Sequence, residues 1–187
     1  MHCPHCHIHT SITPVFTIDG SQADIRDRFN MPWSVGSCNN CFGLVLVGNA
    51  GGTIWPQPLP SDTPKEIPQD IRGNLIEAKM CASISAWRAS GTMCRRAIQM
   101  ASLERGAPLN KTLVEQIKFI KDAGIITNDI HEWATIVRWV GNGGAHPGGV
   151  EAGKENAEVM LELTEQFLYV LYVAPAKAAT HRAKIGK

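Results

Sequence analysis

Two Cys-x-x-Cys pairs near the N-terminus constrain the fold of this chain more than any other feature. The four cysteines are Cys3, Cys6, Cys38 and Cys41. Each pair places two thiols at one tight turn, and four thiolates complete a closed tetrahedral site for structural Zn²⁺. Short β-rich runs lie at residues 15–18 and 42–47. The pattern therefore predicts a small β zinc ribbon over residues 1–54, with the metal held by all four cysteines.

Other residues near the first pair leave alternatives open. One of the surrounding histidines could replace a cysteine ligand, although four thiolates already suffice. These histidines are His2, His5, His7 and His9. A redox role is the other alternative, but two matched pairs favour metal. The remaining cysteines, Cys81 and Cys94, fall on apolar helical faces, which predicts small core residues.

Composition limits the class of protein without naming a partner. The chain has 187 residues and a formal net charge of +1, so any basic surface must be local. No apolar run approaches the ~20 residues that a membrane span needs. The first residues lack the basic and apolar regions of a signal peptide. We therefore expect a cytoplasmic protein with no membrane contact.

Proline marks the boundary between two modules. The segment 55–67 is rich in proline and predicts an extended strap. A helical domain is predicted over residues 68–175, followed by a basic tail at 176–187 that is interpreted as a frayed, solubilising end. The predicted fold class is mainly α: an up-and-down helical bundle preceded by the small β module.

Apolar periodicity predicts five helices in this domain. The first starts at Pro68 and has Met80 and Ile84 widening its apolar face. The second and third end near Gly106 and Gly124. The fourth starts at an N-cap near residues 128–129. The fifth runs over residues 154–173, and the predicted stop is Ala174-Pro175.

A glycine-rich stretch between the last two helices collects chemically active side chains. Arg138, Asn142 and His146 combine a fixed cation, an amide and a titratable imidazole within nine residues. The glycines from Gly141 onward predict a turn. A structural role is the alternative, in which the amide and imidazole bond the turn and the glycines let two helices pack closely.

Several segments of the helical domain carry a family resemblance: Ile67-Pro-Gln-Asp-Ile71, Glu77-Ala78, Cys94-Arg-Arg-Ala97, Leu113 to Ile120, Arg138-Trp-Val-Gly-Asn142 and Ala145-His146. These segments resemble the DUF4145 family. The family is similar to the HEPN superfamily of helical bundles, whose members include RNases of toxin–antitoxin, CRISPR and abortive-infection (phage-defence) systems. The resemblance implies a HEPN-like bundle, a homodimer and engagement of RNA or a nucleotide.

The resemblance also implies roles for the glycine-rich stretch. Asn142 and His146 match the polar residue and histidine of the nuclease motif, whereas Gly141 stands at the arginine position and Arg138 lies three residues earlier. A metal-independent endoribonuclease would use His146 for proton transfer and Arg138 to hold phosphate.

Two further hypotheses come from outside this motif. Arg95 and Arg96 could bind nucleic acid, or they could form ion pairs with Glu77 or Glu104. The alternative function is a non-catalytic dimeric adaptor whose zinc ribbon recruits a protein partner or nucleic acid.

Overall fold

A computed structural model gives the fold as two compact units, and each is described by itself. The first unit spans Met1–Asp62 and the second spans Thr63–Lys187. The boundary between them falls inside the proline-rich segment. The residues that the structure describes are 2–18, 33–48, 53–59, 61–143 and 153–186.

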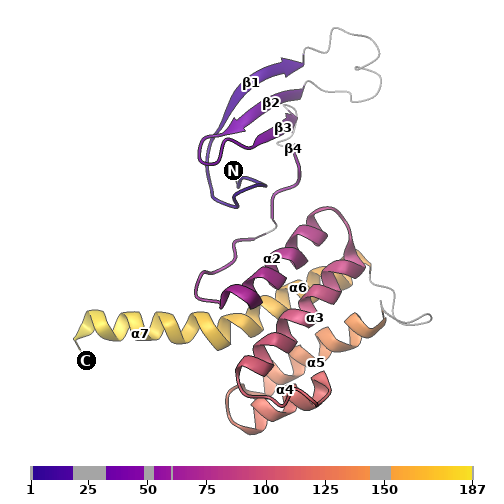
Figure 1. Cartoon of the computed structure of the whole chain (residues 1–187), viewed down its shortest axis with the longest axis vertical. Helices are drawn as coiled ribbons and strands as arrows, with labels where there is room; N and C mark the ends of the chain where they lie inside the picture. Colours follow the sequence, from indigo (N-terminus) through magenta and orange to yellow (C-terminus); the bar gives the residue numbers. More distant parts are fainter. Residues whose placement is uncertain (1, 19–32, 49–52, 60, 144–152, 187) are drawn as a thin grey trace. The chain divides into compact units, whose positions relative to one another are not determined.

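The first unit is a small antiparallel sheet in which sequential strands are neighbours (Figure 1). The runs predicted at residues 15–18 and 42–47 fall on β1 and β3, but β2 and β4 were not predicted. In β2, serine and glycine alternate with larger residues, so the strand lacks a β-rich composition. The strands are β1 (Ile12–Ile18), β2 (Trp33–Cys38), β3 (Leu44–Gly48) and β4 (Thr53–Trp55).

Gly36 explains why β2 tolerates such a composition. A Cβ atom at this position would lie 2.2 Å from Ile12 Cγ2, which is far inside van der Waals contact. The absence of a side chain therefore lets β1 approach β2 closely. The strand β2, one of the two that sequence patterning missed, leads directly into Cys38.

The second unit is mainly helical, as predicted. Its core is formed by the inner faces of its helices, and α3 packs against α2, α4, α5 and α6. Among the residues described, no helix combines the length and apolar character needed to cross a membrane. The helices are α2 (Gln69–Ser83), α3 (Trp87–Glu104), α4 (Leu113–Asp122), α5 (Asn128–Gly143), α6 (Lys154–Leu168), the π-helix η1 (Tyr169–Val173) and α7 (Ala174–Ile185).

Most of the predicted helix boundaries are confirmed. Gly106 and Gly124 follow α3 and α4 with φ angles of 94° and 70°, a left-handed conformation that ends a helix at little cost for glycine. The start of α5 was predicted one to two residues late. Its first residue is Asn128, and the Thr127 hydroxyl accepts a hydrogen bond from the Ile130 N–H at 3.5 Å.

The inner face of α2 differs from the prediction. Met80 and Ile84 are half or more exposed, so they do not widen the apolar face. Lys79 is fully buried instead. Its Nζ lies 2.6 Å from Glu165 Oε1 and donates to Thr63 Oγ1 at 3.0 Å. The buried charge is therefore paired, and it ties the first residue of this unit to α2 and α6.

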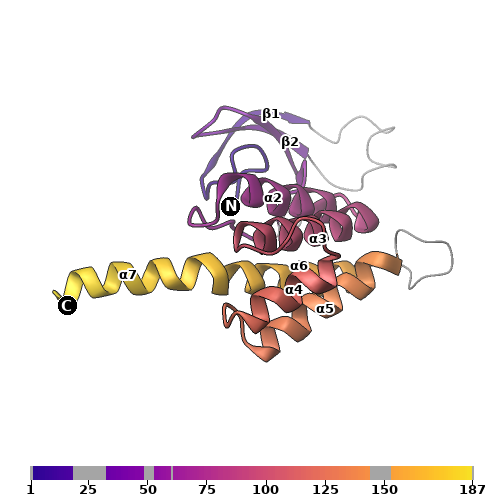
Figure 2. The same ribbon diagram turned by 60° about the horizontal axis from the view of Figure 1, so that its bottom comes forward.

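The predicted helix stop at Pro175 is wrong. The chain continues from α6 through η1 into α7, which extends past the helical core in both views (Figures 1 and 2). In an α-helix, residue 175 would donate its N–H to the carbonyl of residue 171, and proline has no N–H. The Arg105 guanidinium donates to the Leu171 carbonyl at 2.6 Å instead. This substitute donor satisfies the acceptor that Pro175 leaves open.

Arg105 belongs to a small polar cluster that fixes the π-helix. Its guanidinium carbon lies 4.5 Å from the centre of the Tyr172 ring, and its Nε lies 3.2 Å from Glu104 Oε2. The Tyr172 hydroxyl donates to the same Glu104 oxygen at 2.8 Å. Burial and this carboxylate both raise the pKa of Tyr172. The cluster joins the end of α3 to the start of α7.

We predict that Arg105→Met lowers the free energy of unfolding by about 1–3 kcal/mol, because it strands the buried Leu171 carbonyl. The loss of unfolding free energy caused by Arg105→Met should be smaller in a Pro175→Ala background, where the new N–H at position 175 can reach that carbonyl. Denaturant unfolding of the four chains in this double-mutant cycle measures both costs. Arg182→Met on the exposed face of α7 is the control and should be neutral. Equal costs in both backgrounds would contradict this account of the helix.

Candidate metal centre and helical motif

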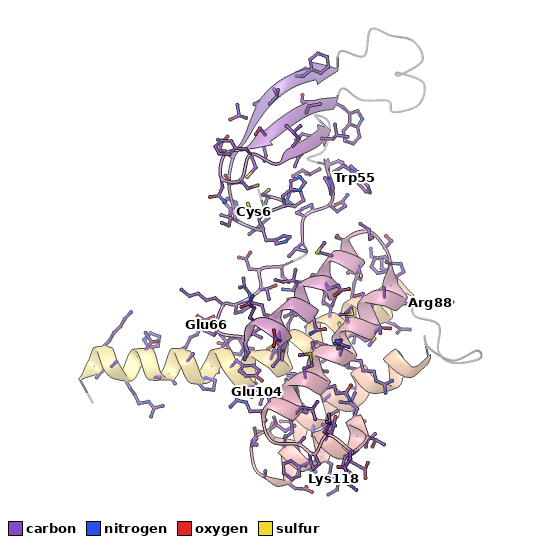
Figure 3. All side chains as sticks on the ribbon, in the orientation of Figure 1. Cys6, Trp55, Glu66, Arg88, Glu104 and Lys118 are labelled. Atoms are coloured by element: carbon purple, nitrogen blue, oxygen red, sulfur yellow. The ribbon has the colours of Figure 1, made fainter. Side chains whose placement is uncertain are left out.

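The four predicted cysteine ligands converge at one end of the sheet. Their sulfur atoms all lie within 4.8 Å of one another. Cys3 Sγ lies 3.8 Å from Cys41 Sγ, and Cys6 Sγ lies 3.9 Å from Cys38 Sγ. A tetrahedral ion with metal–sulfur bonds of about 2.3 Å places its ligands about 3.8 Å apart. The four thiols therefore fit a closed tetrahedral metal site (Figure 3, near Cys6).

The first pair sits in a loop whose backbone bonds organise the thiols. The Cys3 N–H donates to the Ile8 carbonyl at 3.0 Å. The His7 N–H donates to the Cys3 carbonyl, also at 3.0 Å. A third amide, from His5, points at Cys3 Sγ at 3.4 Å. Amide donors of this kind stabilise a thiolate.

The second pair repeats these contacts at the same sequence offsets. The Cys38 N–H donates to the Gly43 carbonyl at 3.0 Å, and the Phe42 N–H donates to the Cys38 carbonyl at 2.9 Å. The Asn40 N–H lies 3.4 Å from Cys38 Sγ. Phe42 has a φ angle of 60°, and its counterpart His7 has one of 59°. The two loops are thus the same structure built twice, as the matched spacing predicted.

Backbone amides and burial give the clustered thiols different pKa values. Amide N–H groups of Cys41 and Asn40 are the main causes that lower the pKa of Cys38 to about 6. Burial raises the pKa of Cys3 to about 12. Four thiolates this close repel one another strongly unless a cation lies between them. A bound divalent metal would neutralise half of that charge and hold all four sulfurs ionised.

The described histidine contacts lie beside the thiol cluster rather than in it. His5 Nε2 lies 2.8 Å from the Leu44 carbonyl, and His2 Nδ1 lies 3.3 Å from Asp62 Oδ1. Gly43 makes room for the first of these rings, since a Cβ there would lie 2.5 Å from His5 Cδ2. The ligand set identified by geometry contains the four cysteines alone. The other two cysteines are part of the helical unit, where Cys94 is fully buried and Cys81 half-buried.

The glycine-rich motif is described only in part. The helix α5 continues through Gly143, so the prediction that a turn begins at Gly141 is wrong. A helical glycine costs only about 1 kcal/mol, and α5 packs its buried residues against α3 and α6. Arg138 and Asn142 are four residues apart in this helix. His146 and the side chains of residues 138–143 lie outside the described part of the structure.

The predicted nucleic-acid residues Arg95 and Arg96 lie in the middle of α3. Arg95 is half-buried and Arg96 is exposed. The alternative pairing with Glu104 is not what the structure shows, because Arg105 and the Tyr172 hydroxyl bind that carboxylate. Sequence reasoning missed these two residues.

The buried Lys79 was also missed, although one signal pointed to it. It follows the buried Leu75 by four residues and so lies on the inward stripe of α2. A lysine on that stripe needs an anionic partner within reach, and the partly exposed Glu165 of α6 supplies it. The sequence contains both residues but not the packing that pairs them.

These features define a two-part protein: a four-cysteine β module followed by a helical domain. The chain belongs to the DUF4145 family, a domain of unknown function whose match covers residues 76–185. The family match therefore includes α7, which sequence reasoning had assigned to a tail outside the domain. Comparison with curated proteins and with solved structures gave no match.

We predict that each purified chain holds one divalent ion, which Co²⁺ can replace with the absorption spectrum of a tetrahedral four-thiolate site. Cys38→Ala should abolish the four-thiolate spectrum because three ligands remain. Cys81→Ala is the matched control, since Cys81 is a half-buried helical thiol outside the cluster. A Cys38→Ala chain that binds Co²⁺ with an unchanged spectrum would contradict the assignment.

Proposed function

We propose that the helical domain engages RNA as a HEPN-like, metal-independent endoribonuclease whose site contains Arg138, Asn142 and His146. The observation that carries the proposal is the helical backbone of α5 through Gly143. Positions four residues apart lie on the same side of an α-helix, so Arg138 and Asn142 share one side. Arg138 therefore takes the role of the arginine that the nuclease motif has at the position of Gly141.

The proposed chemistry needs only groups that this motif contains. His146 of one chain removes the proton from a ribose 2′-hydroxyl, and the 2′-oxygen forms a bond to the adjacent phosphorus. The bond from phosphorus to the 5′-oxygen breaks, and His146 of a second chain protonates that leaving oxygen. Arg138 stabilises the charge on the phosphoryl oxygens, and Asn142 orients the phosphate. The products end in a 2′,3′-cyclic phosphate and a 5′-hydroxyl.

The helix α7 supports an RNA partner independently of the motif. None of its residues is buried, and residues 174–186 include Lys177, Arg182 and Lys184 but no aspartate or glutamate. The whole chain carries a net charge of only +1, so this helix is a local concentration of positive charge. Such a surface suits sequence-independent contacts with phosphates.

We propose Zn²⁺ as the ion of the cysteine cluster. A four-thiolate tetrahedral set with no free position is the usual ligand arrangement of structural zinc. The ion would fix the two loops of the β module, and the proposed RNA cleavage would not pass through it. Elemental analysis of protein purified without added metal identifies the ion.

We predict that the zinc-loaded chain cleaves single-stranded RNA without added Mg²⁺ and leaves cyclic phosphate ends. Because proton transfer typically contributes 10²–10⁴-fold to rate, His146→Ala should lower cleavage by at least about 100-fold. Arg138→Ala should lower it by a similar factor because a charge-stabilising contact is lost. Gel separation of end-labelled RNA with chemical analysis of the ends measures both.

Lys118→Ala is the matched control for these variants. Lys118 is exposed on α4, and its ion pair in the described residues is with Asp122 of the same helix, so its loss should leave cleavage unchanged. RNA that stays equally intact with the wild-type chain and with all three variants would rule out the nuclease. Products with a 3′-hydroxyl would rule out this chemistry even if cleavage occurs.

A second prediction concerns the affinity for RNA. Replacing Lys177, Arg182 and Lys184 by glutamine removes three cations from α7, and each released phosphate contact contributes about 0.7 to the salt slope for single strands. The slope of the logarithm of the binding constant against the logarithm of the salt concentration should therefore become shallower by about 2. Fluorescence anisotropy at several salt concentrations measures this slope, and circular dichroism confirms that the helix persists. An unchanged slope would exclude α7 from the RNA contact.

A further inference from the structure

Four histidines surround the first cysteine pair, and the ligand set of the thiol cluster includes none of them. The ring of His5 is engaged elsewhere, because its Nε2 lies 2.8 Å from the Leu44 carbonyl. His2 and His9 lie directly opposite each other in an isolated antiparallel bridge. The first is half-buried and the second is exposed. Two imidazoles therefore lie side by side at the surface of the β module.

The first cysteine loop holds this histidine pair together. Between His2 and His9 the chain makes the turn that carries Cys3 and Cys6. The Cys3 N–H donates to the Ile8 carbonyl at 3.0 Å, so a backbone hydrogen bond lies directly beside the pair. Opposite residues of an antiparallel pair have their Cβ atoms about 4.5–5.5 Å apart, and their side chains point to the same face. The backbone thus brings the two imidazoles together before any ligand binds.

The spacing of the two rings suits a shared metal ion. Their centroids lie 5.2 Å apart, and the ring planes make an angle of 76°. A tetrahedral ion with metal–nitrogen bonds of about 2.0–2.1 Å holds the centroids of two imidazoles roughly 5.2 Å apart. Imidazole is a preferred ligand of Zn²⁺, Ni²⁺ and Cu²⁺. The pair can therefore supply two nitrogen ligands to one ion at its present separation.

A carboxylate lies behind one of the two rings. Asp62 Oδ1 is 3.3 Å from His2 Nδ1. A histidine that binds a metal through one ring nitrogen commonly donates the N–H of the other nitrogen to a carboxylate. This contact favours the ring with its proton on Nδ1 and leaves Nε2 as the ligand atom. The two side chains are 40% and 75% exposed, so an ion can reach them from solvent.

We propose that His2 and His9 bind a second divalent metal ion, of the imidazole-binding class that includes Zn²⁺, with Asp62 as the positioning residue for His2. Two protein ligands leave two tetrahedral positions for water, so this ion exchanges with solvent, unlike an ion enclosed by four thiolates. The site is separate from the cysteine cluster, whose ligands are all sulfur. It does not depend on the proposed RNA cleavage.

Isothermal titration calorimetry tests the site on the full chain. The cysteine cluster is loaded with zinc beforehand, so that added Zn²⁺ reports only further binding. The wild type should bind one further Zn²⁺ per chain. His2→Gln and His9→Gln each leave a single imidazole, so this second binding event should be lost. Asp62→Ala should weaken it by about 10–100-fold, the usual effect of losing a carboxylate behind a ligating histidine.

Nuclear magnetic resonance of the histidine ring nitrogens gives a measurement that needs no substitution. Added Zn²⁺ should shift the ring nitrogens of His2 and His9 and leave those of His181, on the exposed helix α7, unchanged. Before that addition the His2 proton should lie on Nδ1, and Asp62→Ala should redistribute it between the two ring nitrogens. A carboxylate that only supported the chain would leave this tautomer as it is in the wild type.

Two controls keep the result specific. His5→Gln retains a donor for the Leu44 carbonyl and should leave the further binding intact. The content of tightly bound zinc, measured on each variant, shows that the cysteine cluster has formed. A wild type that binds no further Zn²⁺ would overturn the proposal. So would binding that survives the double variant His2→Gln/His9→Gln, or binding that falls equally in His5→Gln, which would mean diffuse attraction to a histidine-rich segment.

Discussion

Mutual repulsion of four cysteine sulfurs is the constraint on which the N-terminal unit depends. The sulfurs lie within 4.8 Å of one another, and thiolates at that spacing need a cation between them. The matched loops deliver them there with backbone amides directed at Cys3 and Cys38. A sheet of short strands has little core of its own, so the energy of metal binding becomes energy of folding.

The helical unit is stabilised in a different way. Its apolar core is continuous across α2 to η1. One buried lysine and one partly buried arginine bind polar groups at the edges of this core. The buried Lys79 contacts Glu165 and Thr63, so its charge is paired. Arg105 donates to the carbonyl that Pro175 leaves without a donor. These contacts let a single helical path run from α6 into α7, and the family match extends over the same residues.

Local signals in the sequence predicted much of this fold. Cysteine spacing gave the metal cluster, and glycine positions gave the ends of α3 and α4, because both act over a few residues. The predictions were wrong where the local structure depends on contacts with residues distant in the sequence. Pro175 fails to stop the helix because Arg105, far away in sequence, replaces its N–H. β2 was missed because glycine has a low strand propensity, whereas the close approach of Ile12 leaves no room for a side chain at Gly36.

Hydrogen–deuterium exchange on the full chain, with and without a zinc chelator, tests most directly whether the metal holds the β module together. Amides of β2 and β3 should lose their protection when the ion is removed, because the loops that frame these strands then lose their cation. Amides of α3 and α6 should keep theirs, since the helical core has no metal ligand among its described residues. Strands that stay protected in the metal-free chain would contradict the claim that four thiolates and one ion organise this unit.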